Sequence, residues 1–329
     1  MNASRPLRIL VSAQALPRLA QPVRQVLREL PHVLCTPDEG DADIGFVTRD
    51  ITGLSTKHRV LPETRRFHDA LLASPALRWV HIHSAGADRP VYQALLARGV
   101  QVTTSSGANA MVVAHTALAG VLALARRLPQ LWDAQRERRW ASLAGDVLPR
   151  DLEGQHAVLV GWGPIAQNLA RMLQAVGLHV TVVRQGTQPA EGFTSVAADR
   201  WRELLPLADW LLLACPLTPQ TRGMVDAAAL ARLPAHAHLV NVSRGEIVDE
   251  PALVEALRSR RLAGAFLDVF ATEPLPPDSP LWTLPNVIAT PHSAGMSDGN
   301  AARVQRMFLD NLQRFVAGEP LHKLATRAG

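Results

Sequence analysis

The apolar positions of this chain fall into short runs of strand length that alternate with segments of helical period. Buried strands of a parallel sheet read as continuous apolar runs because both faces of the sheet are covered. We predict strands over residues 7–13, 43–48, 78–82, 100–103, 157–160, 180–183, 210–214, 238–242, 264–269 and 285–290. We predict helices over residues 18–30, 63–73, 92–98, 109–128, 129–139, 227–233, 251–259 and 300–315, with a short helix at 201–205. Strands that alternate with helices indicate an α/β fold with parallel sheets.

The segment 157–184 combines a strand, a glycine turn, a helix and a second strand. Gly161 permits the tight turn, Gly163 lets a ligand approach the backbone, and Ala166 is small enough for the helix to pack on the strand. Such a βαβ unit places a pyrophosphate on a helix N-terminus. The alternative is an α/β domain whose glycine turn binds nothing. The predicted dinucleotide contacts in this turn are Gly161, Gly163, Pro164 and Ile165.

The composition narrows the class of protein. The chain has 329 residues, of which 47% are apolar and 19% charged, an ordinary balance for a globular protein of about two domains. No apolar run reaches the ~18 residues of a membrane span, and the N-terminus leads into a strand instead of a signal peptide. Cys35 and Cys215 lack metal-type spacing. We therefore expect a cytoplasmic protein without disulfides, without a metal site and without membrane contact.

The net charge of +5 comes almost entirely from arginine, because Lys57 and Lys323 are the only lysines. The arginines are scattered over helix faces. This pattern indicates a solvated surface and argues against nucleic-acid binding. A positive field still favours small anionic ligands.

The residues that can perform chemistry follow the predicted strands. Ligands of open α/β sheets bind outside the carboxyl ends of the strands, so these positions are expected to meet at one edge. The further cofactor contacts predicted there are Arg184, Cys215, Pro216, Val242, Arg244, Asp268 and His292.

Three side chains at this edge suggest a reaction. Arg244 offers a guanidinium fork for a carboxylate, although a lone arginine more often forms a structural salt bridge. Glu273 and His292 follow two successive predicted strands. A carboxylate bonded to an imidazole orients the ring, fixes its tautomer and favours its charged form, which prepares it to give or take a proton. Each residue alone has a plain structural alternative, such as a turn or a satisfied loop position.

Five segments then occur in an order that resembles the D-isomer-specific 2-hydroxyacid dehydrogenase family. They are V-L-V-G-W-G-P-I-A, C-P-L-T-P-Q-T-R-G-M-V, V-N-V-S-R-G-E-I-V-D-E, G-A-F-L-D-V-F-A-T-E-P-L and V-I-A-T-P-H-S-A-G. The resemblance covers nearly the whole chain. It implies that Arg244 binds a 2-oxo acid, that His292 is the acid/base, that Glu273 pairs with it and that Asp268 faces the nicotinamide.

The resemblance also implies a substrate loop and an interrupted domain. The loop 84–88 would offer backbone N–H groups to the substrate carboxylate through Ala85, Gly86 and Ala87, with Arg244 and His292 as the other substrate contacts. Two Rossmann-like, doubly wound parallel-sheet domains are expected. Residues 1–104 and 296–329 would form a flavodoxin-like substrate domain, and residues 105–295 a cofactor domain inserted into it.

One departure from the family pattern concerns the cofactor. Many NAD-dependent members carry an acidic residue where Arg184 stands, and such a residue bonds the ribose 2′-hydroxyl. An arginine suits a 2′-phosphate, so we predict NADP(H) in preference to NAD(H). Another departure is His115, where many relatives have a glutamate.

The expected activity is reduction of a small 2-oxo acid, such as glyoxylate or hydroxypyruvate, to the D-2-hydroxy acid. Two alternatives stay open: a phosphoglycerate dehydrogenase-like enzyme, and a nucleotide-sensing, corepressor-like interaction protein on the same fold. The family is usually dimeric through the region of the long apolar helix, so a homodimer is expected. Trp132 and Trp140 either contact the partner subunit or pack on their own domain.

Overall fold

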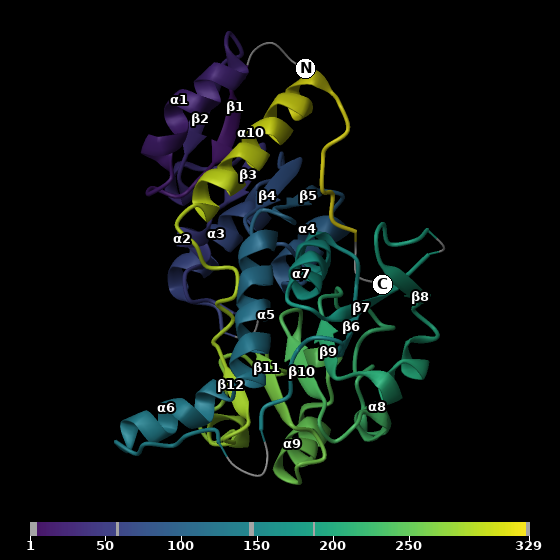
Figure 1. The fold of residues 1–329 in the computed structure, drawn as a ribbon. Helices are drawn as coiled ribbons and strands as arrows, with labels where there is room; N and C mark the ends of the chain where they lie inside the picture. The colour runs from purple at the N-terminus through teal and green to yellow at the C-terminus, as the bar shows by residue number, and fades with distance from the viewer. Residues whose placement is uncertain (1–4, 57–58, 145–147, 187, 327–329) are drawn as a thin grey trace. The chain divides into compact units, whose positions relative to one another are not determined.

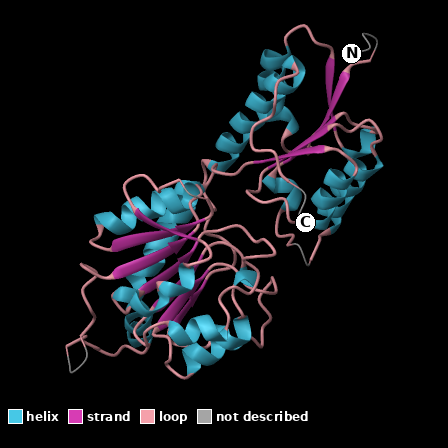
Figure 2. Cartoon of the chain, turned by 90° about the vertical axis from the view of Figure 1, so that its right-hand side faces the viewer, coloured by secondary structure: helices cyan, strands magenta, loops and turns pink. Residues whose placement is uncertain are grey.

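A computed structural model describes residues 5–56, 59–144, 148–186 and 188–326 of the chain. The chain divides into two compact units, one made of residues 1–108 and 297–329 and the other of residues 109–296. Within each unit the strands lie in a layer with helices on both faces (Figure 2). This confirms the predicted fold of two parallel-sheet α/β domains. The outermost residues of the predicted substrate domain, 1–4 and 327–329, lie outside the described residues.

The first unit has its strands in the order β2-β1-β3-β4-β5, which is the flavodoxin-like order of doubly wound sheets (Figure 1). All neighbouring strands are parallel. Its strands are β1 (Leu7–Leu10), β2 (His32–Cys35), β3 (Ile44–Val47), β4 (Trp79–Ile82) and β5 (Gln101–Thr104). Its helices are α1 (Leu16–Leu27), α2 (Arg49–Thr52), α3 (Pro62–Ala73), α4 (Pro90–Ala97) and α10 (Asn300–Ala317).

The alternation of side chains along these strands builds two cores. Ile9 and Phe46 face α1 and α10, while their neighbours Leu10 and Val47 face α3 and α4. Each strand is therefore apolar on both sides, which explains the continuous apolar runs. The segment α10, far away in the sequence, belongs to this unit because Phe308 stacks on Phe46 with ring centroids 4.2 Å apart.

The second unit has its strands in the order β12-β11-β10-β9-β6-β7-β8, again with all neighbours parallel. Read from β6, this contains the dinucleotide-binding strand order 3-2-1-4-5-6. The strands are β6 (His156–Val160), β7 (His179–Arg184), β8 (Thr194–Ala197), β9 (Trp210–Leu213), β10 (His238–Asn241), β11 (Gly264–Leu267) and β12 (Val287–Ala289). The helices are α5 (Ala110–Ala125), α6 (Leu128–Arg136), α7 (Pro164–Ala175), α8 (Ala227–Arg232) and α9 (Glu250–Arg258).

Several element predictions need correction. The strands β2 and β8 were not predicted, because both are only partly buried and their apolar runs are short. The helix predicted over 109–128 ends at Ala125, since Arg127 takes a left-handed conformation with φ of 53° before α6 begins. The short helix predicted at 201–205 is a pair of 3₁₀ turns, Trp201–Glu203 and Leu205–Leu207.

The apolar helix α5 packs on the second unit. It contacts α7, β10 and β11, and Gly120 leaves room for the Phe266 ring, which would lie 2.4 Å from a Cβ atom at that position. Among the described residues no single helix is long and apolar enough to cross a membrane, and α5 and α6 pass that test only together, as a pair bent by 71°.

A buried histidine ties together the strands β4 and β5 of the first unit. Trp79 Nε1 donates to Thr103 Oγ1, and the same hydroxyl lies 2.8 Å from His81 Nδ1. On the other side, His81 Nε2 lies 3.0 Å from Ser105 Oγ, which donates to the carbonyl of Ile82. The chain of bonds keeps the imidazole neutral, because Nδ1 accepts from Thr103 and Nε2 donates to Ser105.

This network makes the stability of the protein dependent on pH. Burial lowers the pKa of His81 from 6.5 to about 3, so the folded protein excludes a proton that the unfolded chain binds. Stability is therefore complete above pH 6.5 and falls at lower pH, with His81 contributing about 1.4 kcal/mol per pH unit. We expect the free energy of unfolding in urea to fall more steeply between pH 6 and 4.5 for wild type than for His81→Gln. The exposed His322→Gln is the control, and equal slopes for wild type and His81→Gln would contradict the assignment.

Candidate functional site

The glycine turn after β6 is closed against the neighbouring strand. Gly161 has φ of +110°, and a Cβ atom there would lie 2.7 Å from the carbonyl oxygen of Ala214. Its N–H donates to the carbonyl of Val183 at 2.8 Å. The position therefore requires glycine both for its backbone conformation and for the space.

The helix α7 begins directly after this turn, with Gly163 at its N-cap and Pro164 in its first turn. Space is open around Gly163, where a Cβ atom would meet no described atom within 4 Å, whereas Ala166 is fully buried against the sheet. The first N–H groups of a helix lack partners within the helix and attract anions. These residues fit the pyrophosphate of a dinucleotide, with Ile165 in the same turn.

Arg184 is the last residue of β7, and its side chain lies along the following loop. Its Nε atom is 3.4 Å from the carbonyl oxygen of Gln185, and its Nη1 atom is 3.3 Å from that of Pro189. Both hydrogen bonds are long and solvent-exposed. The guanidinium can therefore turn toward an anionic ligand at the end of β7.

Cys215, Pro216 and Val242 follow the carboxyl ends of β9 and β10, as predicted. The backbone N of Cys215 would lie 2.9 Å from a Cβ atom at position 161, so this segment lines the glycine turn. Burial raises the pKa of the Cys215 thiol to about 11. The thiol is consequently protonated at neutral pH, which argues against a role as a nucleophile.

Arg244 lies in a tight turn after β10. The side chain of Asn241 closes this turn by accepting from the N–H and hydroxyl of Ser243 and donating to the carbonyl of Arg244. Gly245 packs directly against the chain at Phe270, where a Cβ atom would lie 1.9 Å from a backbone carbon. The arginine is half-buried, and its Nη1 donates to the carbonyl of Ser243 at 2.7 Å. The turn thus holds the guanidinium beside the segment that carries Glu273.

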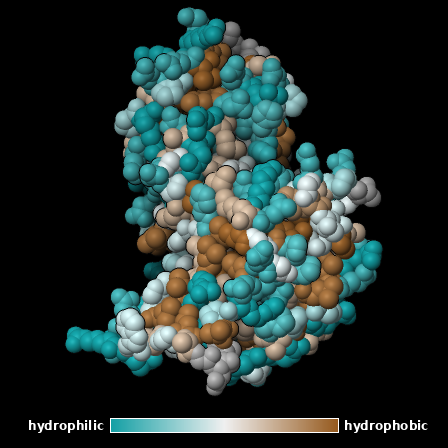
Figure 3. Space-filling view, in the orientation of Figure 1, coloured by the Kyte–Doolittle hydropathy of each residue, from teal (hydrophilic) through white to brown (hydrophobic). Residues whose placement is uncertain are grey.

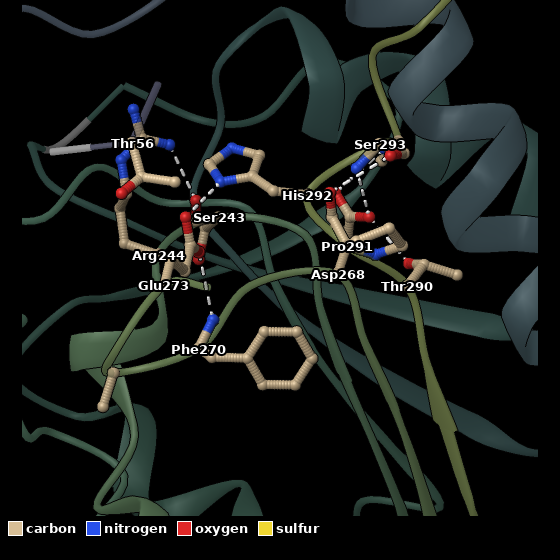
Figure 4. A network of polar contacts seen from close by, with 12 residues as sticks. Thr56, Ser243, Arg244, Asp268, Phe270, Glu273, Thr290, Pro291, His292 and Ser293 are labelled. Carbon is tan, nitrogen blue, oxygen red and sulfur yellow. Dashed lines mark hydrogen bonds and ion pairs between the residues drawn. The ribbon is translucent and has the colours of Figure 1, made fainter. Parts of the chain in front are cut away.

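Glu273 and His292 form a hydrogen-bonded pair. The Nδ1 atom of His292 lies 2.8 Å from Oε2 of Glu273, while the other carboxylate oxygen accepts from the N–H of Phe270 at 3.2 Å (Figure 4). The Glu273 side chain is 13% exposed and that of His292 is 50% exposed. The carboxylate is therefore fixed behind the ring, and the Nε2 side of the imidazole is the one that a ligand can reach.

Asp268 secures the loop that carries His292. Its Oδ1 accepts from the Thr290 hydroxyl at 2.6 Å and from the N–H of Ser293 at 2.8 Å, and its Oδ2 accepts from the N–H of Ala294 at 3.0 Å (Figure 4). Its backbone carbonyl accepts from the N–H of His292, which has a left-handed φ of 50°. Burial raises the pKa of Asp268 against the opposing effect of these donors. Asp268 therefore has a structural role in this loop, besides the place beside a nicotinamide that the family resemblance implies.

The predicted substrate loop belongs to the first unit, where it follows β4. The hydroxyl of Ser84 donates to the carbonyl of Gly86, and the amide of Gln93 donates to the carbonyl of Ala87. These bonds occupy two carbonyl oxygens of the loop and none of its N–H groups. Ala85 is exposed and Ala87 is buried.

Sequence reasoning missed three residues of the site: Asn241, Gly245 and Thr290. The asparagine two residues before a serine is a signal for a side-chain-closed turn and could have been read from the sequence. The roles of Gly245 and Thr290 depend on partners more than 20 positions away, and no local pattern indicates them.

An imidazole paired with a carboxylate, a guanidinium in an adjacent turn and a glycine-lined helix N-terminus can together transfer a proton, bind a carboxylate and hold a dinucleotide. The comparisons with known proteins identify the family. Residues 118–294 match the family described as D-isomer specific 2-hydroxyacid dehydrogenase, NAD binding domain. A glyoxylate reductase from Korarchaeum cryptofilum is 35% identical over 253 residues, which are 75% of this chain and 75% of that protein.

An (S)-sulfolactate dehydrogenase from Chromohalobacter salexigens is 35% identical over 254 residues, covering 76% of this chain and 81% of the relative. Among solved structures, a D-isomer-specific 2-hydroxyacid dehydrogenase from Xanthobacter autotrophicus Py2, in complex with NADPH and MES, superposes with a TM-score of 0.75. That match has 29% sequence identity and covers 98% of this chain and 99% of the other. The chain belongs to the D-isomer-specific 2-hydroxyacid dehydrogenase family and is an NAD(P)-dependent dehydrogenase of 2-hydroxy acids.

Proposed function

We propose that this enzyme reduces a small 2-oxo acid, of the size of glyoxylate or hydroxypyruvate, to the D-2-hydroxy acid. The observation that carries the proposal is the 2.8 Å bond between His292 Nδ1 and Glu273, which leaves Nε2 as the proton donor. The similarity to a glyoxylate reductase supports the choice of a short substrate. In this proposal the first unit is the substrate domain and the second unit is the cofactor domain.

Each residue has one role in the proposed reaction. Arg244 binds the substrate carboxylate through its guanidinium fork, and the backbone N–H groups of Ala85, Gly86 and Ala87 bind it as well. A nicotinamide cofactor, when bound, supplies the hydride that reduces the carbonyl carbon. His292 gives the proton from Nε2 to the carbonyl oxygen and takes it back in the reverse direction. Glu273 stabilises the imidazolium and holds the ring.

The cofactor would be held by the second unit. Gly161, Gly163, Pro164 and Ile165 receive the pyrophosphate at the start of α7. Cys215, Pro216, Val242 and Asp268 line the strand ends along which the rest of the cofactor extends, next to Arg244 and His292.

A turnover screen tests the proposed function. Glyoxylate, hydroxypyruvate, pyruvate and phenylpyruvate are each incubated with NADPH and with NADH, and oxidation of the cofactor is followed by absorbance. We expect glyoxylate and hydroxypyruvate to be reduced with the highest kcat/KM. Glycolate, the product from glyoxylate, has no stereocentre, so the expected D configuration is checked on the glycerate formed from hydroxypyruvate. A preference for phenylpyruvate or formation of the L-acid would contradict the proposal.

The preference for NADP(H) over NAD(H) rests on Arg184. Among the described residues its guanidinium forms two long hydrogen bonds, both to loop carbonyls, so it can bind a 2′-phosphate at the end of β7. The binding of NADPH by the solved relative from Xanthobacter autotrophicus supports this choice.

Arg184→Asp is expected to reverse the cofactor preference. The aspartate repels the 2′-phosphate and accepts a hydrogen bond from the 2′-hydroxyl, so kcat/KM for NADPH falls about 100-fold while that for NADH rises. Initial rates with both cofactors give the ratio, and Arg200→Asp, another exposed arginine of this unit, is the control. A wild-type enzyme that already favours NADH would overturn the assignment.

We also propose that the enzyme is a homodimer located in the cytoplasm. On α5, Met111 and Leu122 are exposed, and beyond it Trp132 and Trp140 are 44% and 98% exposed. Hydrophobic residues gather over the α5, α6 and β12 part of the second unit in the view of Figure 3. Exposed apolar side chains gathered in one region are typical of an interface. Both cysteines are free and buried, which supports a reducing compartment.

A further inference from the structure

Three basic side chains lie near the carboxyl ends of two neighbouring strands of the first unit. Arg49 follows β3, His83 follows β4 directly, and Arg89 precedes α4. We call Arg49, His83 and Arg89 the cationic cluster. The loop 84–88, proposed above to bind the substrate carboxylate, lies in the sequence between the second and third members.

Arg89 is held in place with one donor unused. Its Nη2 atom donates to the carbonyl of Ser55 at 2.6 Å, and Ser55 is itself fixed by a hydrogen bond of 2.7 Å to Thr64 Oγ1. Its Nη1 atom is buried and has no hydrogen-bond partner in the part of the chain that the structure describes. A buried guanidinium N–H without an acceptor is costly, so its retention indicates an acceptor supplied by a ligand.

Arg89 is close enough to Arg49 for its charge to disfavour the charged form of Arg49. Burial lowers the pKa of Arg49, and the charge of Arg89 lowers it further. Burial, followed by the charges of Arg49 and Arg89, lowers the pKa of His83 to about 3, so His83 is neutral, and its Nε2 lies 2.8 Å from Thr52 Oγ1. The acidic neighbour Asp50 forms an ion pair of 3.4 Å with Arg18 instead.

Two like charges kept together at the ligand edge of a sheet are stabilised by an anion between them. We propose that the cationic cluster binds a second acidic group of the substrate, so that the preferred 2-oxo acids are dianions with a carboxylate, sulfonate or phosphate group on the side chain. This inference rests on the proposed function, because it takes the loop 84–88 as the site of the first carboxylate.

The experiment compares substrates that differ only in the second charge. Oxaloacetate carries a carboxylate where 2-oxobutyrate carries a methyl group, and 3-sulfopyruvate tests a sulfonate at the same place. For wild type we expect kcat/KM to be at least 10-fold higher for one or both dianions than for 2-oxobutyrate, with a preference that shrinks as salt is added. Arg49→Gln and Arg89→Lys should each reduce this preference several-fold. Arg65→Gln, on the exposed side of α3, is the matched control and should keep it.

The variant set allows for the structural contact of Arg89. Arg89→Lys keeps the charge and can still reach Ser55, whereas Arg49→Gln removes a charge without removing a side-chain hydrogen bond that holds the loop. Thermal unfolding of each variant verifies that it is folded. A preference that is equal in wild type and Arg49→Gln, or a wild type that reduces 2-oxobutyrate as well as both dianions, would overturn the proposal.

The outcomes separate this inference from the function beneath it. If glyoxylate and hydroxypyruvate are reduced but dianions are not preferred, the proposed role of the cationic cluster is wrong and the proposed function is retained. If no 2-oxo acid is reduced, the proposed function is wrong, and a binding experiment then tests whether the cationic cluster is an anion site. Malonate should then raise the melting temperature of wild type more than propionate does, and should lose this advantage in Arg49→Gln. Equal shifts by malonate and propionate would reject the cluster as an anion site.

Discussion

His292→Ala is expected to lower kcat by about 10³-fold, because general acid–base catalysis contributes ~10²–10⁴ in rate. Glu273 binds Nδ1 of the imidazole at 2.8 Å, no other described residue hydrogen-bonds to the ring, and its exposed Nε2 side is the proton donor of the proposed reaction. Alanine removes the proton donor while Asp268 still holds the surrounding loop through Thr290, Ser293 and Ala294. The loss should therefore appear in kcat at saturating cofactor and 2-oxo acid, with a small change in KM.

Two further variants make this result specific. Glu273→Gln keeps a hydrogen-bond acceptor beside Nδ1 but removes the negative charge, so kcat should fall by less than in His292→Ala, about 10- to 100-fold. His322→Ala, an exposed histidine in the first unit, should change kcat by less than twofold. The role assigned to His292 is wrong if His292→Ala retains more than a tenth of the wild-type kcat.

Arg244→Ala should lower kcat/KM for the 2-oxo acid by about 10³-fold, chiefly through a higher KM. Loss of a bidentate, charge-assisted contact to a carboxylate costs roughly 2–5 kcal/mol when the site is shielded from water. The turn that holds Arg244 is built from Asn241 and from the packing of Gly245 on Phe270, and neither needs the guanidinium. The fold should therefore survive, and the KM of the cofactor should rise far less than that of the acid.

The lysine variant distinguishes charge from shape. Arg244→Lys keeps the charge without the fork and should recover only part of the lost kcat/KM. Arg258→Ala removes one positive charge from an exposed part of α9 in the same unit and controls for a general field effect. Equal losses in Arg258→Ala and Arg244→Ala, or a KM for the acid that stays at the wild-type value in Arg244→Ala, would contradict substrate binding by Arg244.

Two of the four edge strands show where pattern reading stops. The strands β2 and β8 were missed, although the edge strands β5 and β12 and all the inner strands were predicted to within a few residues. A strand at the edge of a sheet has one neighbour and only partial cover, so it keeps polar positions and loses the apolar run that signals a strand. The β8 segment Thr194–Ala197 has no fully buried residue, and no local feature distinguishes it from a loop.

The candidate site also contains features that could be predicted from the sequence and features that could not. The positions of Gly161, Arg244, Glu273 and His292 after successive strands were predicted from the sequence. The pairing of His292 with Glu273 was predicted from the resemblance to a family. In contrast, the attachment of the His292 loop to Asp268, and the unused N–H of Arg89, depend on the positions of individual atoms. No spacing in the sequence reports these.

The sequence by itself determined the alternation of strands and helices, the glycine turn before α7 and the order of the motifs that carry the chemistry. These features are local, since backbone propensity, apolar period and the absence of a Cβ atom act within a few residues. The tertiary structure supplied the strand orders of the two sheets and the contacts that hold α10 in the first unit, which only the family resemblance, and no local pattern, had led us to expect there. Which carboxylate bonds to which loop is also visible only in the tertiary structure. These depend on contacts between residues tens to hundreds of positions apart, such as Phe46 with Phe308 and Asp268 with Ala294, and only packing of the whole chain brings such pairs together.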